Sequence, residues 1–125
     1  VEPVLHALEQ NEKVESVYYP GRYANKDQAI IASSCYQHGG GVISFEVRKD
    51  VDLSLSQYNL HSSKMAPSFG STDTLIERPA TMSHAGKSDL ELSKIGISLR
   101  HVRLSVGMEP ISYILSDLER VLSDG

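Results

Sequence analysis

The sequence predicts an α/β (α+β) sandwich, with one sheet of four or five strands and helices on one of its faces. Three observations support this prediction: β-branched segments alternate with helical ones, short turns connect them, and the chain ends on a strong amphipathic stripe. At 125 residues the chain has the length of one domain with a single modest core. Periodicity alone leaves open whether the strands run parallel or antiparallel.

The chain is predicted to open on a helix, because apolar residues recur at helical spacing at its start. These residues are Val1, Val4, Leu5 and Leu8. No capping residue precedes this apolar face, so we expect the helix to begin upstream of the printed sequence.

Two strands are predicted in the first half of the chain. Residues 14–19 alternate between apolar and polar and end at Pro20-Gly21, and residues 42–47 (VISFEV) alternate more strictly. One face of the second strand is apolar throughout and is expected to be buried: Ile43, Phe45 and Val47.

A helix is predicted between these strands, over residues 25–36. Asn25 can cap it and the glycines at 39–41 end it. Its small and apolar residues are expected to face inward: Ala29, Ile30, Ala32 and Ser33. The only cysteine, Cys35, lies near the end of this helix, where we expect a small buried or half-buried side chain and no catalytic thiol.

The middle of the chain is predicted to form short elements. Residues 51–61 are mixed in period, and we interpret them as a helix because Asp50 or Asp52 can cap it. Short strands are predicted at 65–69 and 74–77, with a Gly-Ser turn between them.

The last third of the chain is predicted as helix, strand and helix. Ser88 can cap a short helix that ends at about residue 95, and a β-branched strand follows at 102–106 and ends in a glycine. The final helix has the clearest apolar stripe of the chain, formed by Ile111, Ile114, Leu115, Leu118, Val121 and Leu122.

Composition argues against several classes of function. The formal net charge is −4 and no stretch gathers basic residues, which argues against a nucleic-acid surface. No apolar stretch approaches the roughly 20 residues that span a bilayer, and the start of the chain has no signal-peptide pattern. A single cysteine allows no internal disulfide, so we expect a cytoplasmic protein.

Arg103 is the residue that points most directly to chemistry. It lies inside a β-branched strand (HVRLSVGME, 101–109), where an unpaired guanidinium is costly to desolvate. One interpretation makes it the partner of a buried carboxylate such as Glu109 or Asp117. The other makes it a clamp for a ligand carboxylate, because the guanidinium fork binds planar anions through two parallel hydrogen bonds.

The same segment, together with PSFG at 67–70 and RPATMSHAG at 78–86, resembles the pyridoxal-phosphate enzymes of cysteine and methionine metabolism. Cystathionine γ-synthase, cystathionine γ-lyase and methionine γ-lyase belong to this family. The resemblance covers nearly the whole chain but only the C-terminal domain of these fold-type I enzymes. It implies a mainly antiparallel sheet, and it implies that 1–125 is a C-terminal domain in which 1–11 belong to the helix arriving from the larger domain.

The resemblance assigns substrate-binding roles to three residues. Arg103 stands where the arginine of the family's RLSVG motif grips the α-carboxylate of the substrate, and Ser68 stands where the serine of its SLG motif lies beside that carboxylate. Here the motif reads SFG after Pro67, where many relatives carry an acidic residue. Glu77 stands where γ-lyase relatives carry a glutamate at the entrance to the site. Without the resemblance, Ser68 reads as an ordinary turn serine and Glu77 as an exposed acid at a strand end.

The resemblance also implies pyridoxal 5'-phosphate as the cofactor of the intact enzyme. The family keeps its Schiff-base lysine and its phosphate- and ring-binding groups in the larger domain, and the motifs around them do not occur in this sequence. Lys64 matches no family lysine, and we interpret His84 as a histidine that packs in a loop. We therefore expect no catalytic, cofactor-binding or metal-binding residue in these 125 residues, and no activity from them alone.

The implied reaction is γ-elimination or γ-replacement on a sulfur amino acid or an acyl-homoserine, as in cystathionine γ-synthase or γ-lyase. This chain would bind the amino-acid substrate's carboxylate, dock on the larger domain and form part of a homotetramer. Methionine γ-lyase or O-acetylhomoserine sulfhydrylase activity is an alternative. A non-catalytic, stand-alone interaction domain is the alternative from another class.

Overall fold

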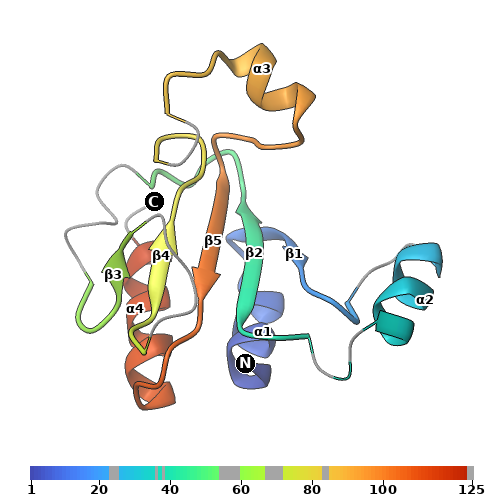
Figure 1. Cartoon of the computed structure of the whole chain (residues 1–125). Helices are drawn as coiled ribbons and strands as arrows, with labels where there is room; N and C mark the ends of the chain where they lie inside the picture. Colours follow the sequence, from blue (N-terminus) through green and yellow to red (C-terminus); the bar gives the residue numbers. More distant parts are fainter. Residues whose placement is uncertain are drawn as a thin grey trace.

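The computed structural model describes residues 1–22, 26–35, 37, 39–53, 60–66, 72–82 and 85–123. In these residues a five-stranded sheet is covered on one face by α1 and α4 (Figure 1). The described helices are α1 (Glu2–Gln10), α2 (Lys26–Cys35), α3 (Asp89–Lys94) and α4 (Ile111–Ser123). The described strands are β1 (Val14–Tyr18), β2 (Val42–Val47), β3 (Lys64–Met65), β4 (Leu75–Glu77) and β5 (His101–Ser105). None of the described helices is long and apolar enough to cross a bilayer.

The sheet is mixed and mainly antiparallel. Its strand order is β1-β2-β5-β4-β3, so β5 is the middle strand. The pairs β1–β2, β2–β5 and β4–β5 are antiparallel, and the edge pair β3–β4 is parallel. The predicted fold class is therefore confirmed, including the antiparallel character implied by the family resemblance.

The core lies between the sheet and the two covering helices. The apolar face predicted for β2 is confirmed, since its three residues are fully buried: Ile43, Phe45 and Val47. The stripe of α4 is buried over four of its predicted residues: Ile114, Leu118, Val121 and Leu122. Ile111, in the first turn of α4, stays 40% exposed, so this end of the predicted stripe is not buried. At the other end of the chain, α1 buries Val4, Leu5 and Leu8, as predicted.

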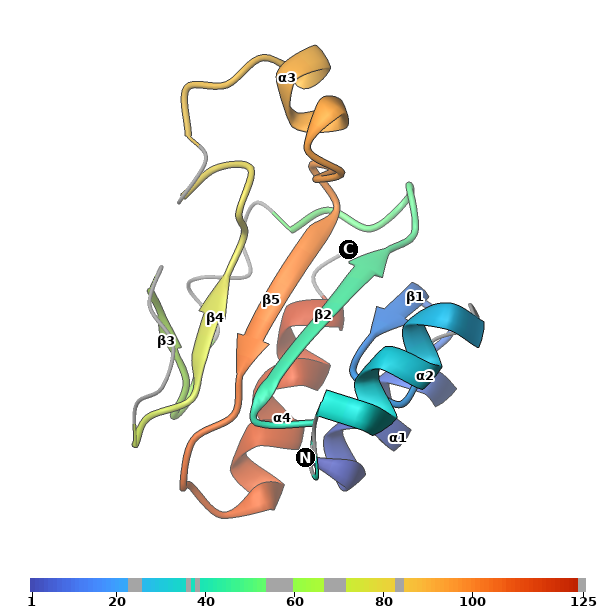
Figure 2. The ribbon, with the colours of Figure 1, turned by 45° about the vertical axis from the view of Figure 1, so that its right-hand side comes forward.

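The inward packing predicted for α2 is wrong. This helix lies beyond β1, off the edge of the sheet (Figure 1 and Figure 2). Ile30 and Ile31 are each 61% exposed, and Ser33 is exposed as well. Because α2 lies off the edge of the sheet, neither isoleucine packs against the core that the described residues form. The burial predicted for Cys35 is wrong too, because its side chain is exposed at the end of this helix.

Two further predictions have different outcomes: the helix over 51–61 is not found in its described residues, whereas the cap of the short helix is confirmed. No helix is formed at 51–53 or at 60–61, and the rest of that predicted helix (54–59) lies outside the described residues, as does the predicted cap Asn25. The short helix α3 has the predicted cap: the amide of Glu91 donates to Ser88 Oγ at 3.3 Å, and the amide of Ser88 donates to the Glu91 carboxylate at 2.7 Å. In Figure 1, α3 lies beyond one end of the strands.

Candidate functional site

Arg103 and Glu77 lie directly opposite each other on neighbouring strands. The antiparallel register of β4 and β5 pairs these two residues. Both side chains lie on the sheet face away from α1 and α4, because the neighbours of Arg103 on β5, Val102 and Leu104, belong to the core. Arg103 Nη2 and Glu77 Oε2 form an ion pair, in which the Glu77 side chain is 1% and the Arg103 side chain 22% exposed. The guanidinium is thus held by a buried carboxylate and remains partly accessible.

This pair corrects two interpretations made from the sequence. The buried-carboxylate interpretation of Arg103 named Glu109 or Asp117 as its partner, but both of these accept hydrogen bonds from other groups. The interpretation of Glu77 as an exposed acid is also wrong, since the residue is buried. A contact between Glu77 and a substrate stays a prediction.

Glu109 connects the start of β4 to the chain that follows β5. Its carboxylate accepts hydrogen bonds from the amide of Thr74 and from Thr74 Oγ1, each at 2.6 Å. Burial raises the pKa of the Glu109 carboxyl, but the two hydrogen bonds from Thr74 outweigh it and lower the pKa below its ordinary value. Glu109 is therefore held as a carboxylate and fixes the position of Thr74.

Gly107 brings the same two segments into close contact. Its amide donates to Thr74 Oγ1 at 2.9 Å, and the amide of the next residue donates to the carbonyl of Thr72 at 2.8 Å. A Cβ on Gly107 would lie 2.5 Å from Thr72 O, Asp73 C and Thr74 N, so no side chain fits there. The glycine after the Arg103 strand thus allows β4 to dock beside β5 in the register that sets Glu77 opposite Arg103.

Asp117 anchors the segment that leads into β3. This buried residue of α4 accepts hydrogen bonds from three successive backbone amides, those of His61 at 2.5 Å, Ser62 at 2.9 Å and Ser63 at 2.7 Å. Burial would raise the pKa of the Asp117 carboxyl, but these amides outweigh it and lower the pKa to about 2. The sequence signal was an acid within a buried stripe, which requires buried hydrogen-bond partners.

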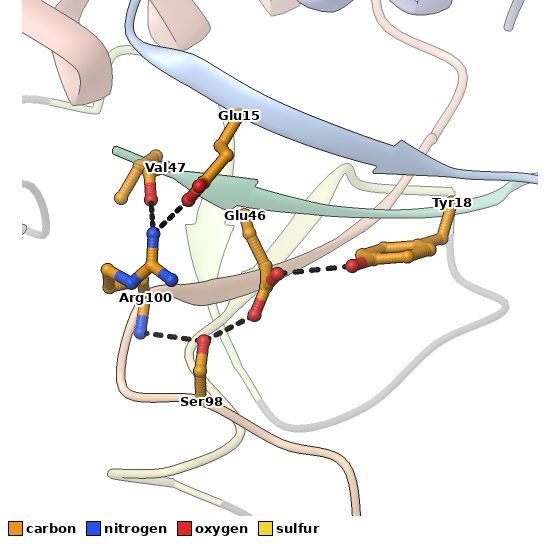
Figure 3. Close-up of polar contacts among 6 residues, drawn as sticks. All are labelled: Glu15, Tyr18, Glu46, Val47, Ser98 and Arg100. Carbon is orange, nitrogen blue, oxygen red and sulfur yellow. Dashed lines mark hydrogen bonds and ion pairs between the residues drawn. The ribbon is translucent and has the colours of Figure 1, made fainter. Parts of the chain in front are cut away.

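A polar network fixes the start of β5, and its members were not recognised from the sequence (Figure 3). Glu46 on β2 accepts hydrogen bonds from the hydroxyls of Ser98 and Tyr18. Burial raises the pKa of the Glu46 carboxyl, but the two hydroxyls outweigh it and hold the pKa below its ordinary value. Arg100 donates to the carbonyl of Val47 at 2.8 Å and pairs with the carboxylate of Glu15. The network joins the turn before β5 to β1 and β2.

His101 lies between this network and Arg103. Its ring stacks on that of Tyr18, with the ring centroids 5.9 Å apart and the planes 16° from parallel. Burial lowers the pKa of His101, and the positive charge of Arg103 lowers it further against the opposing effect of Glu46. The imidazole is therefore neutral at pH 7, and it adds no positive charge beside Arg103.

The structure brings together two of the three expected substrate-binding residues, Arg103 and Glu77. Ser68 lies outside the described residues, together with Pro67 and His84, so its position beside Arg103 stays a prediction. Within the described part of the chain, no three His, Cys, Asp or Glu side chains gather as a metal site.

Comparison with known proteins identifies the family. The family described as Cys/Met metabolism PLP-dependent enzyme matches residues 3–123. The chain belongs to this family. A cystathionine beta-lyase of Coxiella burnetii is 39% identical over 118 residues, which cover 92% of this chain and 30% of that protein. A cystathionine gamma-lyase of Dictyostelium discoideum is 37% identical over 120 residues, which cover 95% of this chain and 31% of that protein.

Solved structures of Cys/Met metabolism enzymes have the same fold. A cystathionine gamma-lyase from Lactobacillus plantarum, complexed with L-serine, matches with a TM-score of 0.88 at 32% identity over 98% of this chain and 32% of that one. A cystathionine gamma synthase from Xanthomonas oryzae pv. oryzae, in complex with cystathionine, matches with a TM-score of 0.84 at 29% identity, over 98% of this chain and 32% of that one. The expected family is confirmed, and the chain spans about a third of the length of these relatives.

The cofactor of this family is pyridoxal phosphate, and Lys64 and Lys13 differ from the lysine that it needs. A lysine that forms a Schiff base must lose its proton readily. Lys64 instead pairs with Asp73 at 2.5 Å, and the hydrogen bond to Asp73 raises the pKa of its ammonium group. Lys13 donates to the carbonyl of Leu122 at the end of α4. Neither lysine therefore fits the role of the cofactor's Schiff-base partner.

Proposed function

We propose that this chain is the C-terminal domain of a PLP-dependent transsulfuration enzyme and that Arg103 binds the α-carboxylate of its amino-acid substrate. The observation that carries the proposal is the position of Arg103, whose partly accessible guanidinium lies on the sheet face left open by α1 and α4. The family membership supports it, since the relatives are named as cystathionine lyases, methionine gamma-lyases and a cystathionine gamma synthase.

Arg103 would bind and orient the substrate without making or breaking bonds. A hydrogen bond between charged groups contributes about 1.5–3 kcal/mol, and two parallel ones fix the plane of the carboxylate. Orientation of this kind lowers the entropic cost of reaching the reactive geometry. Ser68 would assist from the neighbouring segment.

The proposed reaction is γ-elimination or γ-replacement on a sulfur amino acid or an acyl-homoserine, of the cystathionine γ-synthase or γ-lyase type. The cystathionine gamma-lyase of Dictyostelium discoideum is 37% identical to this chain. An L-methionine gamma-lyase of Fusobacterium nucleatum subsp. polymorphum matches at the same identity. Substrate assays should therefore include cystathionine, methionine and O-acetylhomoserine.

The proposal assigns pyridoxal phosphate and its lysine to a larger domain of the same protein. That domain would face the open side of the sheet, because Arg103 must meet the substrate there. A homotetramer in the cytoplasm completes the proposed assembly.

The test is the Arg103→Ala variant of the full-length protein. We expect the KM for the amino-acid substrate to rise about 10- to 100-fold, the equivalent of about one lost charge-assisted hydrogen bond, while the cofactor absorbance stays. Arg22→Ala is a matched control, since Arg22 forms a surface ion pair with Glu2 at 2.7 Å and should leave KM unchanged. An unchanged KM in Arg103→Ala would contradict the proposal.

A further inference from the structure

Glu77 is a buried carboxylate whose position calls for an explanation beyond stability. Its side chain is 1% exposed, and Arg103 Nη2 is its ion-pair partner. Burial of an ion pair costs desolvation energy that often equals or exceeds what the pair contributes to folding. A pair of this kind is therefore better explained by the geometry that it imposes on Arg103.

The backbone of β4 fixes the position of Glu77 relative to Arg103. All three residues of β4 are buried, and Glu77 stands directly opposite Arg103 in the β4–β5 register. Side chains in such cross-strand pairs start about 4.5–5.5 Å apart at Cβ, so the two long side chains meet on the face of the sheet. The contacts of Thr74 with Glu109 and Gly107 keep β4 in this register.

We propose that Glu77 is a positioning residue that holds the guanidinium of Arg103 in the orientation that receives the substrate carboxylate. This inference rests on the proposed function of Arg103. A free arginine side chain samples many rotamers, and a contact made before the substrate arrives removes most of that freedom in advance. The 22% exposure of the Arg103 side chain leaves it accessible to the substrate while Glu77 holds it.

The charge of Glu77 has to be separated from its positioning effect. A negative charge beside Arg103 also weakens the attraction of the guanidinium for a second carboxylate. Removing that charge would strengthen binding, whereas losing the orientation would weaken it. The useful variants are therefore pairs of the same charge that differ in whether residue 77 can accept a hydrogen bond from Arg103.

The experiment uses the full-length enzyme with its cofactor bound. Affinities for L-alanine and for L-alaninamide are measured from the change in the visible absorbance of the cofactor, and their ratio reports recognition of the carboxylate. Glu77→Gln and Glu77→Met are both neutral and of similar length, but only glutamine can accept a hydrogen bond from Arg103. We expect the acid-to-amide ratio to be at least about fivefold lower in Glu77→Met than in Glu77→Gln, since an accepted hydrogen bond contributes about that factor. Equal ratios would overturn the inference.

A second variant covers the case in which Glu77→Met does not fold. Glu77→Asp keeps the charge but withdraws the carboxylate by one methylene, so the ratio should fall below that of the unmodified enzyme; an unchanged ratio would overturn the inference. Glu46→Gln is the control, because Glu46 lies on the same sheet face, has Ser98 and Tyr18 as partners and should leave the ratio unchanged.

Arg103→Ala separates failure of this inference from failure of the proposed function. If Arg103→Ala keeps the ratio of the unmodified enzyme, carboxylate binding by Arg103 is wrong and the inference falls with it. If Arg103→Ala lowers the ratio while Glu77→Met and Glu77→Asp leave it unchanged, only the positioning role of Glu77 is wrong.

Discussion

The hydroxyl of Thr74 accepts a hydrogen bond from the amide of Gly107 at 2.9 Å and donates one to the carboxylate of Glu109 at 2.6 Å. One side chain thus joins the beginning of β4 to the chain that leaves β5. The contact lies at one end of the strand pair, and the ion pair of Glu77 with Arg103 lies at the other. The two ends together fix how β4 sits against the middle of the sheet.

Replacement of Gly107 by alanine should disturb this junction. A Cβ would meet backbone atoms at 2.5 Å, and these cannot move without shifting 72–74. We expect a loss of about 1–3 kcal/mol in the free energy of unfolding, the range for overpacked sites, measured by urea denaturation. Gly41→Ala is the control, because its Cβ would lie 3.5 Å from Val106 O, an ordinary contact. Equal stability of the two variants would contradict the close packing at Gly107.

Asp117 should make stability depend on pH in the acid range. Its pKa falls from 3.8 to about 2 on folding, so the native state favours the ionised form. The contribution of this ionised carboxylate to the free energy of unfolding is about 2 kcal/mol. It is fully present above pH 4 and is lost as the pH falls through 2. Free energies of unfolding at pH 2 to 7 should show the original chain and Asp117→Asn converging below pH 4. A difference between them that stays constant over this range would contradict the assignment.

The capping box of α3 should protect that helix locally. Ser88→Ala removes the oxygen that accepts from the Glu91 amide, at a cost of about 1 kcal/mol to the helix. Because α3 has six residues and buries only Leu92, we expect the global melting temperature to change little. Hydrogen exchange should instead show the Glu91 amide exchanging about fivefold faster. Ser93→Ala, at an exposed position of the same helix, should leave that rate unchanged.

The mass of the intact protein tests the proposed domain organisation. The printed chain has a mass of 13.7 kDa and covers 30% of the Coxiella relative. If it is the C-terminal domain of a PLP-dependent enzyme, mass spectrometry of the protein expressed from its native gene should give a value about threefold higher. A measured mass of 13.7 kDa would instead favour the stand-alone interaction domain.

The elements with a clear apolar period were predictable from the sequence. In α1, β2 and α4 the buried residues follow helical or alternating spacing, which reflects contact with one common core. The helix α2 was predicted as a helix, but its packing was predicted wrongly, because it lies off the edge of the sheet and away from the core. Helix formation there follows local preference, whereas burial depends on a neighbouring surface that sequence periodicity does not reveal.

The site was predictable only in part for a similar reason. Arg103 was identified because a charge within a β-branched strand is unusual. The partners expected for it, Glu109 and Asp117, would have held the last helix against the sheet. The actual partner, Glu77, comes from strand register, which sequence separation does not indicate. Asp117 and Glu109 are likewise explained by distant backbone amides and hydroxyls.

The place of Arg103 on the middle strand also bears on how accurately the chain folds. A slip of one residue in the pairing of β5 would turn every side chain of that strand to the opposite face. The guanidinium would then point into the apolar layer beneath α1 and α4, while Val102 and Leu104 would face water. Such a misfolded state is strongly unfavourable, so the same charge that we assign to substrate recognition also rejects incorrect strand pairings during folding.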